Sequence, residues 1–135
     1  MLKYLNYPAY LVDNLCDVKA YRINYNKTSG PEHITFSNVY GIFIKYGKLV
    51  MCSLGGYISK TSSNQVYNCT LSPESFEDEI RPMYGKVIGN HIIGSYQHLV
   101  AECSINTNGI ISLNNGSSEA CENNWFTGTI AYLIE

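Results

Sequence analysis

Short runs that alternate in polarity at every second residue, each ended by glycine, asparagine or proline, recur along this chain of 135 residues. The clearest example is residues 105–113, INTNGIISL, where an alternating run flanks Asn108-Gly109 on each side. Both central residues of a type I′ turn need a positive φ, which Asn and Gly reach at low cost. The stretch therefore predicts a hairpin in which residues 105–107 pair with 110–113.

The same alternation continues over most of the chain. Because successive side chains of a strand point to opposite faces, each alternating run predicts a strand, and residues 124–135 are expected to form one that is buried on both faces. Tyr46-Gly47-Lys48 predicts a second hairpin, Gly55-Gly56 is expected to interrupt the run that follows, and glycines 89 and 94 predict bulges or bends. The predicted strands lie within residues 19–26, 39–58, 64–71, 85–105 and 124–135.

Helical signals are weak by comparison. Residues 73–82 are bounded by Pro73 and Pro82 and have room for a single helical turn. Residues 1–16 could form either a short helix or an extended arm, and their pattern does not choose between the two. Many short strands separated by turn residues are typical of all-β folds, so we predict an antiparallel β-sandwich of the jelly-roll kind.

The charge balance narrows the possible partners. Nine Lys and Arg residues stand against eleven Asp and Glu residues without a basic run, so the chain lacks the positive surface that nucleic-acid binding needs. No apolar run approaches the ~18 residues of a membrane-spanning helix. A chain of 135 residues fits one domain. We therefore expect one domain with neither a nucleic-acid nor a membrane partner.

The cysteines are five in number, which cannot all pair within one chain. They have neither a CxxC pair nor the Cys-His spacing of a zinc site. Cys52 and Cys103 lie in alternating runs, where a thiol packs as a small apolar group. We expect no metal site, folding in a reducing compartment, and free thiols at Cys16, Cys52, Cys69, Cys103 and Cys121.

Two clusters contain residue types that can carry catalysis. The acidic residues within 74–79 could supply the two carboxylates of a glycosidase, but a solvated loop with Arg81 as its counter-charge explains them better. His91, His98 and Cys103 are close in sequence, yet positions 91 and 98 point to opposite faces of an uninterrupted strand. Because no established catalytic or nucleotide-binding motif occurs either, we expect no enzyme activity.

Aromatic residues are the better candidates for ligand binding. The chain has twelve tyrosines, which suit contacts with polar ligands such as sugars, although many of them would fill strand positions. Trp125 follows the polar stretch 117–123 and is the first candidate for a platform on which a sugar ring stacks; a core tryptophan is the equal alternative. Tyr84, Asn90 and His91 are weaker candidates for the same site.

Four motifs occur in an order that resembles the C-terminal head domains of receptor-binding proteins in the tail fibres and baseplates of phages that infect Gram-positive bacteria. The resemblance covers residues 39–135. The motifs are a Lys-x-Gly-x-x-Val hairpin at 45–50, a Leu-Pro-x-x-x-Arg-Pro turn enlarged by the acidic insert at 71–82, an Ile-x-Thr-Asn-Gly-x-Ile hairpin at 105–111, and a closing Tyr-Leu-Ile at 132–134.

The resemblance implies a jelly-roll head over residues 39–135. Residues 1–38 lie outside the resemblance and are expected to form an N-terminal arm or strand. It implies a homotrimer in the virion tail, assembled in the bacterial cytoplasm with other tail or baseplate proteins. Such a head binds a saccharide of the host cell surface without cleaving it and without a cofactor. Its sugar contacts lie in variable loops, so the hairpins are expected to be scaffold.

Two other functions stay open. A structural virion or tail-assembly protein could share the fold and bind only protein. A glycoside hydrolase that uses the acidic residues 74–79 is the weaker alternative.

Overall fold

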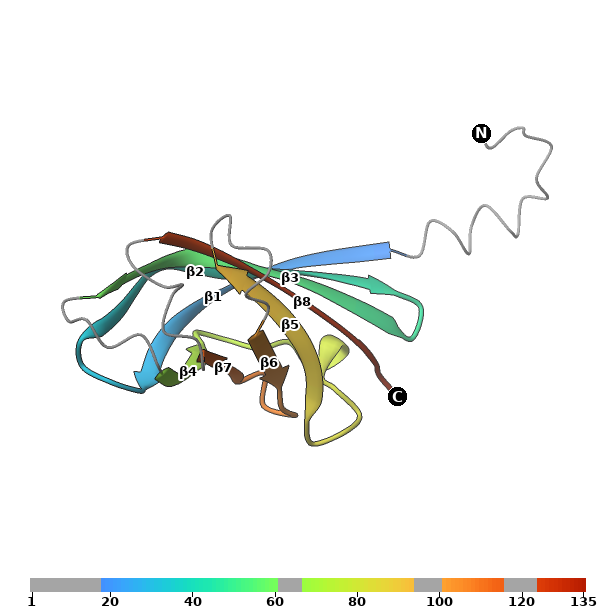
Figure 1. The fold of residues 1–135 in the computed structure, drawn as a ribbon. Helices are drawn as coiled ribbons and strands as arrows, with labels where there is room; N and C mark the ends of the chain where they lie inside the picture. Colours follow the sequence, from blue (N-terminus) through green and yellow to red (C-terminus); the bar gives the residue numbers. More distant parts are fainter. Residues whose placement is uncertain (1–17, 61–66, 94–100, 116–123) are drawn as a thin grey trace, which may run out of the picture.

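The structure, a computed structural model, describes residues 18–60, 67–93, 101–115 and 124–135 (Figure 1). Within these residues the chain forms strands and one short 3-10 helix, η1. In chain order they are β1 (Val18–Ser29), β2 (Ile34–Tyr46), β3 (Leu49–Lys60), β4 (Tyr67–Pro73), η1 (Asp78–Ile80), β5 (Val87–Ile93), β6 (Ala101–Ile105), β7 (Ile111–Asn115) and β8 (Asn124–Leu133).

The strands join in one closed barrel with the order β1-β2-β3-β8-β5-β6-β7-β4. Figure 1 shows the long strands β1, β2, β3 and β8 in one wall, opposite a wall of β4, β5, β6 and β7. All neighbouring pairs are antiparallel, so the predicted all-β antiparallel fold is confirmed. The structure differs from a two-sheet sandwich or jelly roll because the pairings β1–β4 and β5–β8 join the walls along both edges, which leaves no sheet edge open.

The core lies between the two walls and follows from the alternation. In β8 every second residue is buried, from Phe126 to Tyr132, and the residues between them are exposed, so the expectation that this strand is buried on both faces is wrong. Burying one face of each strand removes apolar surface from water, which is the main force that closes the barrel. The largest fully buried side chains come from both walls and from η1: Phe43, Phe126, Ile34, Leu54, Ile58, Leu71, Ile80, Ile105, Ile111, Leu113 and Ile130.

The hairpin between β6 and β7 is confirmed, but its predicted register is wrong by one residue. Ile105 pairs with Ile111, and residues 107–109 form a three-residue connection. The N–H of Gly109 donates to the carbonyl of Asn106 at 3.0 Å, and only Gly109 of the predicted Asn-Gly pair has a positive φ, 78°. The two-residue turn would have placed Ile105 and Ile111 on opposite faces, whereas the observed connection buries both.

Three other turn predictions have different outcomes. The hairpin at Tyr46-Gly47-Lys48 is confirmed, with Gly47 at φ 61°. Gly55-Gly56 does not interrupt β3, which continues to Lys60. Gly89 is not a bulge, since the β5–β6 register is continuous across it. A Cβ at Gly89 would lie 2.2 Å from the carbonyl oxygen of Thr129, so glycine is needed for the close approach of β5 to β8. Gly94 lies outside the described residues.

The remaining local predictions concern the N-terminus, the helical turn and the thiols. Residues 18–38 form β1 and the start of β2, while residues 1–17 lie outside the described part. The single turn predicted within 73–82 is confirmed as η1. Cys52 and Cys103 are buried free thiols and Cys69 is buried; Cys16 and Cys121 lie outside the described residues. Among the described residues, no helix is long and apolar enough to cross a membrane.

Candidate functional site

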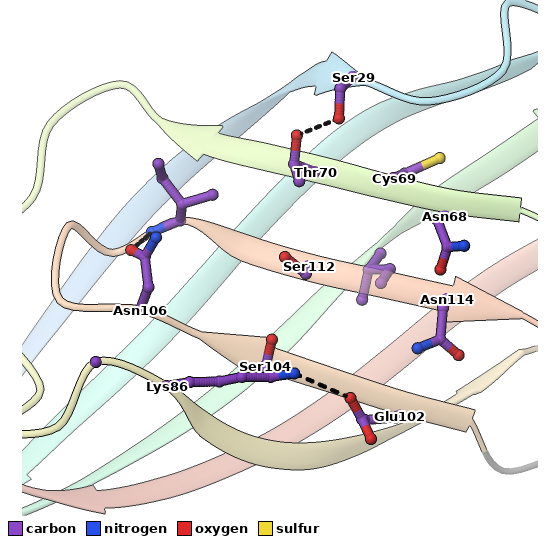
Figure 2. A pocket seen from close by; sticks show the side chains of 13 residues that line it. Ser29, Asn68, Cys69, Thr70, Lys86, Glu102, Ser104, Asn106, Ser112 and Asn114 are labelled. Atoms are coloured by element: carbon purple, nitrogen blue, oxygen red, sulfur yellow. Dashed lines mark hydrogen bonds and ion pairs between the residues drawn. The ribbon is translucent and has the colours of Figure 1, made fainter.

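A polar groove of about 440 Å³ crosses the outside of the short-strand wall (Figure 2). It runs from the end of β1 over β4, β7 and β6 to the loop that precedes β5. Its volume falls in the range of small-molecule sites in proteins, ~300–1,000 Å³. The polar side chains that line it from the strands are Ser29, Asn68, Thr70, Glu102, Ser104, Ser112 and Asn114.

Strand alternation explains why these polar side chains gather. In β4 and β7 the inward residues Cys69 and Leu113 are buried in the core, so the neighbours of each point to the outer face. The strand register then aligns the outward residues in rows. Thr70 lies opposite Ser112, and Ser112 lies opposite Ser104. A second row begins with Asn68 opposite Asn114, and the groove therefore follows the rows across the strands.

Hydroxyl groups dominate one end of the groove. The hydroxyls of Ser29 and Thr70 are 2.6 Å apart, and the hydroxyl of Thr28 lies 3.1 Å from those of Thr70 and Ser72. A hydroxyl can donate or accept, so this cluster can reorient its hydrogens to match a ligand. The Asn68 and Asn114 amides each add one carbonyl oxygen and two N–H bonds to the same wall.

The other end of the groove has one charge of each sign. Lys86 Nζ lies 3.7 Å from Glu102 Oε1, and both side chains are about half exposed (Figure 2). An exposed pair at this separation contributes little to stability. A ligand hydroxyl could donate to the carboxylate and accept from the ammonium without uncovering a buried charge. The groove as a whole suits a polar, uncharged ligand with many hydroxyl groups.

Two of the candidates from the sequence lie beside the groove. Tyr84 is 60% exposed in the loop before β5 and directly precedes Gly85 and Lys86, which line the groove. Asn90 is exposed on β5 and pairs with Glu102. His91 follows it in β5 and pairs with Ala101, but its side chain lies outside the described part of the structure.

Trp125 lies on β8, with β5 between it and the groove. Its side chain is 56% exposed, so the core alternative is wrong. The indole meets Tyr57 edge to face, with 5.1 Å between ring centroids. Asn90 pairs with Thr129, which places Trp125 four residues, or about 13 Å, further along β8. The structure thus brings Tyr84 and Asn90 to the groove edge and leaves Trp125 apart from them.

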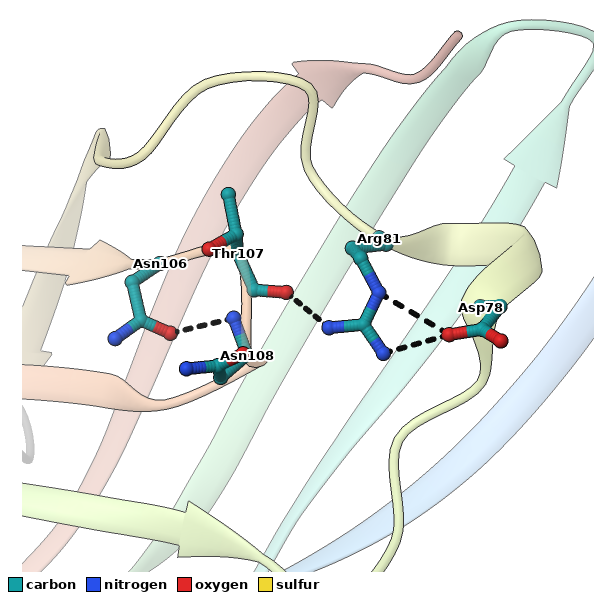
Figure 3. A network of polar contacts seen from close by, with 5 residues as sticks. All are labelled: Asp78, Arg81, Asn106, Thr107 and Asn108. Carbon is teal, nitrogen blue, oxygen red and sulfur yellow. Dashed lines mark hydrogen bonds and ion pairs between the residues drawn. The ribbon is translucent and has the colours of Figure 1, made fainter.

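The acidic insert is a local scaffold rather than only a solvated loop (Figure 3). Arg81 Nη2 lies 2.6 Å from Asp78 Oδ1, which confirms Arg81 as the counter-charge. Arg81 also donates to the carbonyl of Thr107 and so connects η1 with the β6–β7 hairpin. Within that hairpin, Asn106 Oδ1 accepts from the Asn108 N–H at 2.8 Å.

Glu79 is held in its charged form. The hydroxyl of Tyr21 donates to Glu79 at 2.5 Å, and Lys19 Nζ lies 2.9 Å from the same carboxylate. The hydrogen bond from Tyr21 and then that from Lys19 lower the pKa of Glu79 below its ordinary value. A glycosidase acid needs the opposite shift, because it must hold a proton until the leaving group takes it.

Neither a thiol nucleophile nor a metal cluster occurs among the residues with described positions. Burial raises the pKa of Cys103 to about 12, so its thiolate form is negligible at neutral pH. His98 lies outside the described residues. In the described ranges, no group of three or more His, Cys, Asp or Glu side chains could hold a metal ion.

No family model matches the chain, and no curated protein matches it. The candidate site therefore depends on the geometry of the groove. Sequence reasoning missed its strand residues, although a signal was present: Asn68-x-Thr70-x-Ser72 and Ser112-x-Asn114 place small polar side chains at successive outward positions.

Proposed function

We propose that this chain is a non-catalytic saccharide-binding domain and that the groove across β4, β7 and β6 holds the sugar. One observation carries the proposal: a concave surface of suitable size is lined by hydroxyls, amides and a single pair of opposite charges. Neutral sugars are bound through such groups because each ligand hydroxyl both donates and accepts. The rigid strands beneath the groove support it by fixing the positions of these groups.

The biological setting we propose is the receptor-binding head of a phage or prophage tail, which would bind a saccharide of the host cell surface. The resemblance of residues 39–135 to such heads supports this setting. The setting includes a homotrimer that docks on other tail or baseplate proteins in the virion and is assembled in the bacterial cytoplasm. Trp125 with Tyr57 belongs to the proposal as a second contact, for a glycan long enough to pass over β5.

The proposal does not include catalysis. Two of the four carboxylates of the acidic insert are already engaged: Asp78 by Arg81, and Glu79 by Tyr21 and Lys19. The lowered pKa of Glu79 also disfavours its use as a general acid. The glycosidase alternative therefore has no support from the contacts of these residues.

A glycan array of Gram-positive cell-wall polysaccharides tests the proposal, followed by titration of the best ligand. Asn114→Ala should weaken binding about tenfold, because the ligand loses a hydrogen-bonding partner in the groove. Asn24→Ala, an exposed asparagine on the opposite wall, is the matched control and should bind like the wild type. Equal binding by the wild type and Asn114→Ala, or no binding to any glycan, would contradict the proposal.

A further inference from the structure

The outer face of the long-strand wall contains a block of apolar side chains at the end where β2 turns into β3. Two rows of paired residues cross β1, β2, β3 and β8 there. We call this block the apolar face. Its first row is Val18, Tyr46, Leu49 and Leu133, and its second row is Ala20, Ile44, Met51 and Ala131.

The side chains of the apolar face are well exposed. Leu49, at 39%, is the least exposed of its large residues, and Leu133, at 52%, is the most exposed. The two rows contain no charged residue. Charge begins at their borders, with Arg22, which stacks on Tyr40 at 3.8 Å, on one side and Lys48 in the β2–β3 turn on the other. The groove wall of the same barrel has Ser, Thr and Asn at equivalent outward positions, so the barrel itself does not require apolar residues there.

The size of the apolar face is unusual for a surface that stays in water. Six large side chains with about half of their surface exposed amount to roughly 600 Å², the upper end of what single-chain proteins expose in one patch. Figure 1 shows that this end of the long-strand wall extends past β4 and β7, and the face lies on the outer side of that wall. An approaching surface can therefore reach it without covering the groove.

We propose that the apolar face packs against a second copy of this chain. Two such faces together bury roughly 1,200 Å², which exceeds the ~1,000 Å² that a specific interface needs. Identical faces without charged side chains can meet without repulsion, and sheets pack face to face about 10 Å apart with interdigitated side chains. The polar border around Arg22 matches the polar rim that surrounds the apolar centre of such interfaces.

The self-association would supply a contact surface for the homotrimer of the proposed setting, and it does not depend on saccharide binding. The apolar face and the groove occupy opposite walls, so association leaves the groove of each copy open to solvent. A tail-assembly protein without any sugar ligand would use the same face. Loss of one property therefore does not predict loss of the other.

Sedimentation velocity of the full chain over a range of micromolar concentrations tests the proposal. The wild type should form a complex of two or three copies. Met51→Glu places a carboxylate at the centre of the face and should raise the concentration needed for half-assembly by about 100-fold or more, because a buried charge would lack a partner. Ile88→Glu is the matched control: Ile88 is 60% exposed on β5, in the other wall, and its substitution should leave assembly unchanged.

Circular dichroism and thermal melting show whether each variant is folded. Leu133→Ser is a second, milder disruption of the same face and should shift assembly in the same direction as Met51→Glu. A monomeric wild type would overturn the proposal. It would do so even if Met51→Glu lowered the melting temperature, because that result would mean that other residues of the same chain cover the face. Undiminished assembly of folded Met51→Glu and Leu133→Ser would overturn it as well.

Discussion

The hydroxyl of Tyr132 donates a hydrogen bond to the main-chain carbonyl of Ile80, with 2.5 Å between the two oxygens. Tyr132 lies in β8 and Ile80 ends η1, and both side chains are buried. Burial raises the pKa of Tyr132 above its ordinary value, so the hydroxyl keeps its proton. This bond connects η1 with the long-strand wall. Arg81, the residue after Ile80, connects the same segment with the β6–β7 hairpin.

Tyr132→Phe should lower the free energy of unfolding by about 1–2 kcal/mol, because it leaves the Ile80 carbonyl buried without its partner. Urea denaturation followed by circular dichroism measures the change. Tyr84→Phe removes a hydroxyl from a tyrosine that is 60% exposed and should have almost no effect. An equal change in the two variants would mean that the bond between Tyr132 and Ile80 does not contribute.

Gly89→Ala should destabilise the barrel by about 1–3 kcal/mol or more, because the added methyl group meets the main chain of Thr129 at 2.2 Å and neither strand can move away freely. Gly85→Ala is its control, since a Cβ there meets nothing within 4 Å. That variant should be neutral or more stable by ~0.4–1 kcal/mol through the lower entropy of its unfolded chain. Urea denaturation of both variants measures the free energy of unfolding. A Gly89→Ala variant as stable as the wild type would contradict the close approach of β5 to β8.

The fold was predictable as far as local chemistry determines it. Alternation places Phe126 and Tyr132 inward, and Gly47 marks its turn. The register of the β6–β7 hairpin was not predictable from Asn108-Gly109 alone, because the burial of Ile105 and Ile111 on one face overrides the turn preference of the pair. Closure into a barrel depends on the pairings β1–β4 and β5–β8, which join residues far apart in sequence and leave no local signal.

The stability contributed by Glu79 should depend on pH. Its pKa is lowered below 4.5 by the hydrogen bonds from Tyr21 and Lys19, so the folded state binds the proton more weakly than the unfolded state does. The contribution is therefore complete at pH values above the ordinary pKa of 4.5, and it is lost as the pH falls through the lowered pKa. Melting temperatures of Glu79→Gln and wild type should differ at pH 7 and converge in acid. Glu32→Gln, an exposed control, should follow the wild type throughout.

Cys52 and Cys103 should resist alkylation in the folded protein. Burial raises the pKa of each thiol to about 12, and each side chain is 1% exposed. Reaction needs the thiolate and access to it, so iodoacetamide at pH 8 should modify neither residue until the protein is unfolded in urea. Peptide mass spectrometry reports each site separately. Modification of Cys52 in the native protein at the rate seen in urea would contradict its place in the core.

The groove was harder to predict than the fold because its residues are ordinary ones in rows. Thr70, Ser112 and Ser104 are separated in sequence, and only the register of β4, β7 and β6 makes them neighbours. Trp125 was a candidate because it follows the polar stretch 117–123 and an indole can stack on a sugar ring, and sequence alone could not decide whether it was buried. Tyr84 and Asn90 lie beside residues that line the groove, and their role in binding stays a prediction.

Trp125→Ala separates a binding role from a structural one. Because the indole is 56% exposed, its removal should cost less than about 1 kcal/mol of stability, whereas a core tryptophan would cost about 3–5 kcal/mol. If a long saccharide stacks on the indole, the lost apolar contact of about 1.5–3 kcal/mol should weaken polysaccharide binding at least ~10-fold. Thermal melting and polysaccharide titration of the same preparation measure both effects. A stable variant that binds polysaccharide as tightly as the wild type would remove Trp125 from the site and leave the groove as the whole of it.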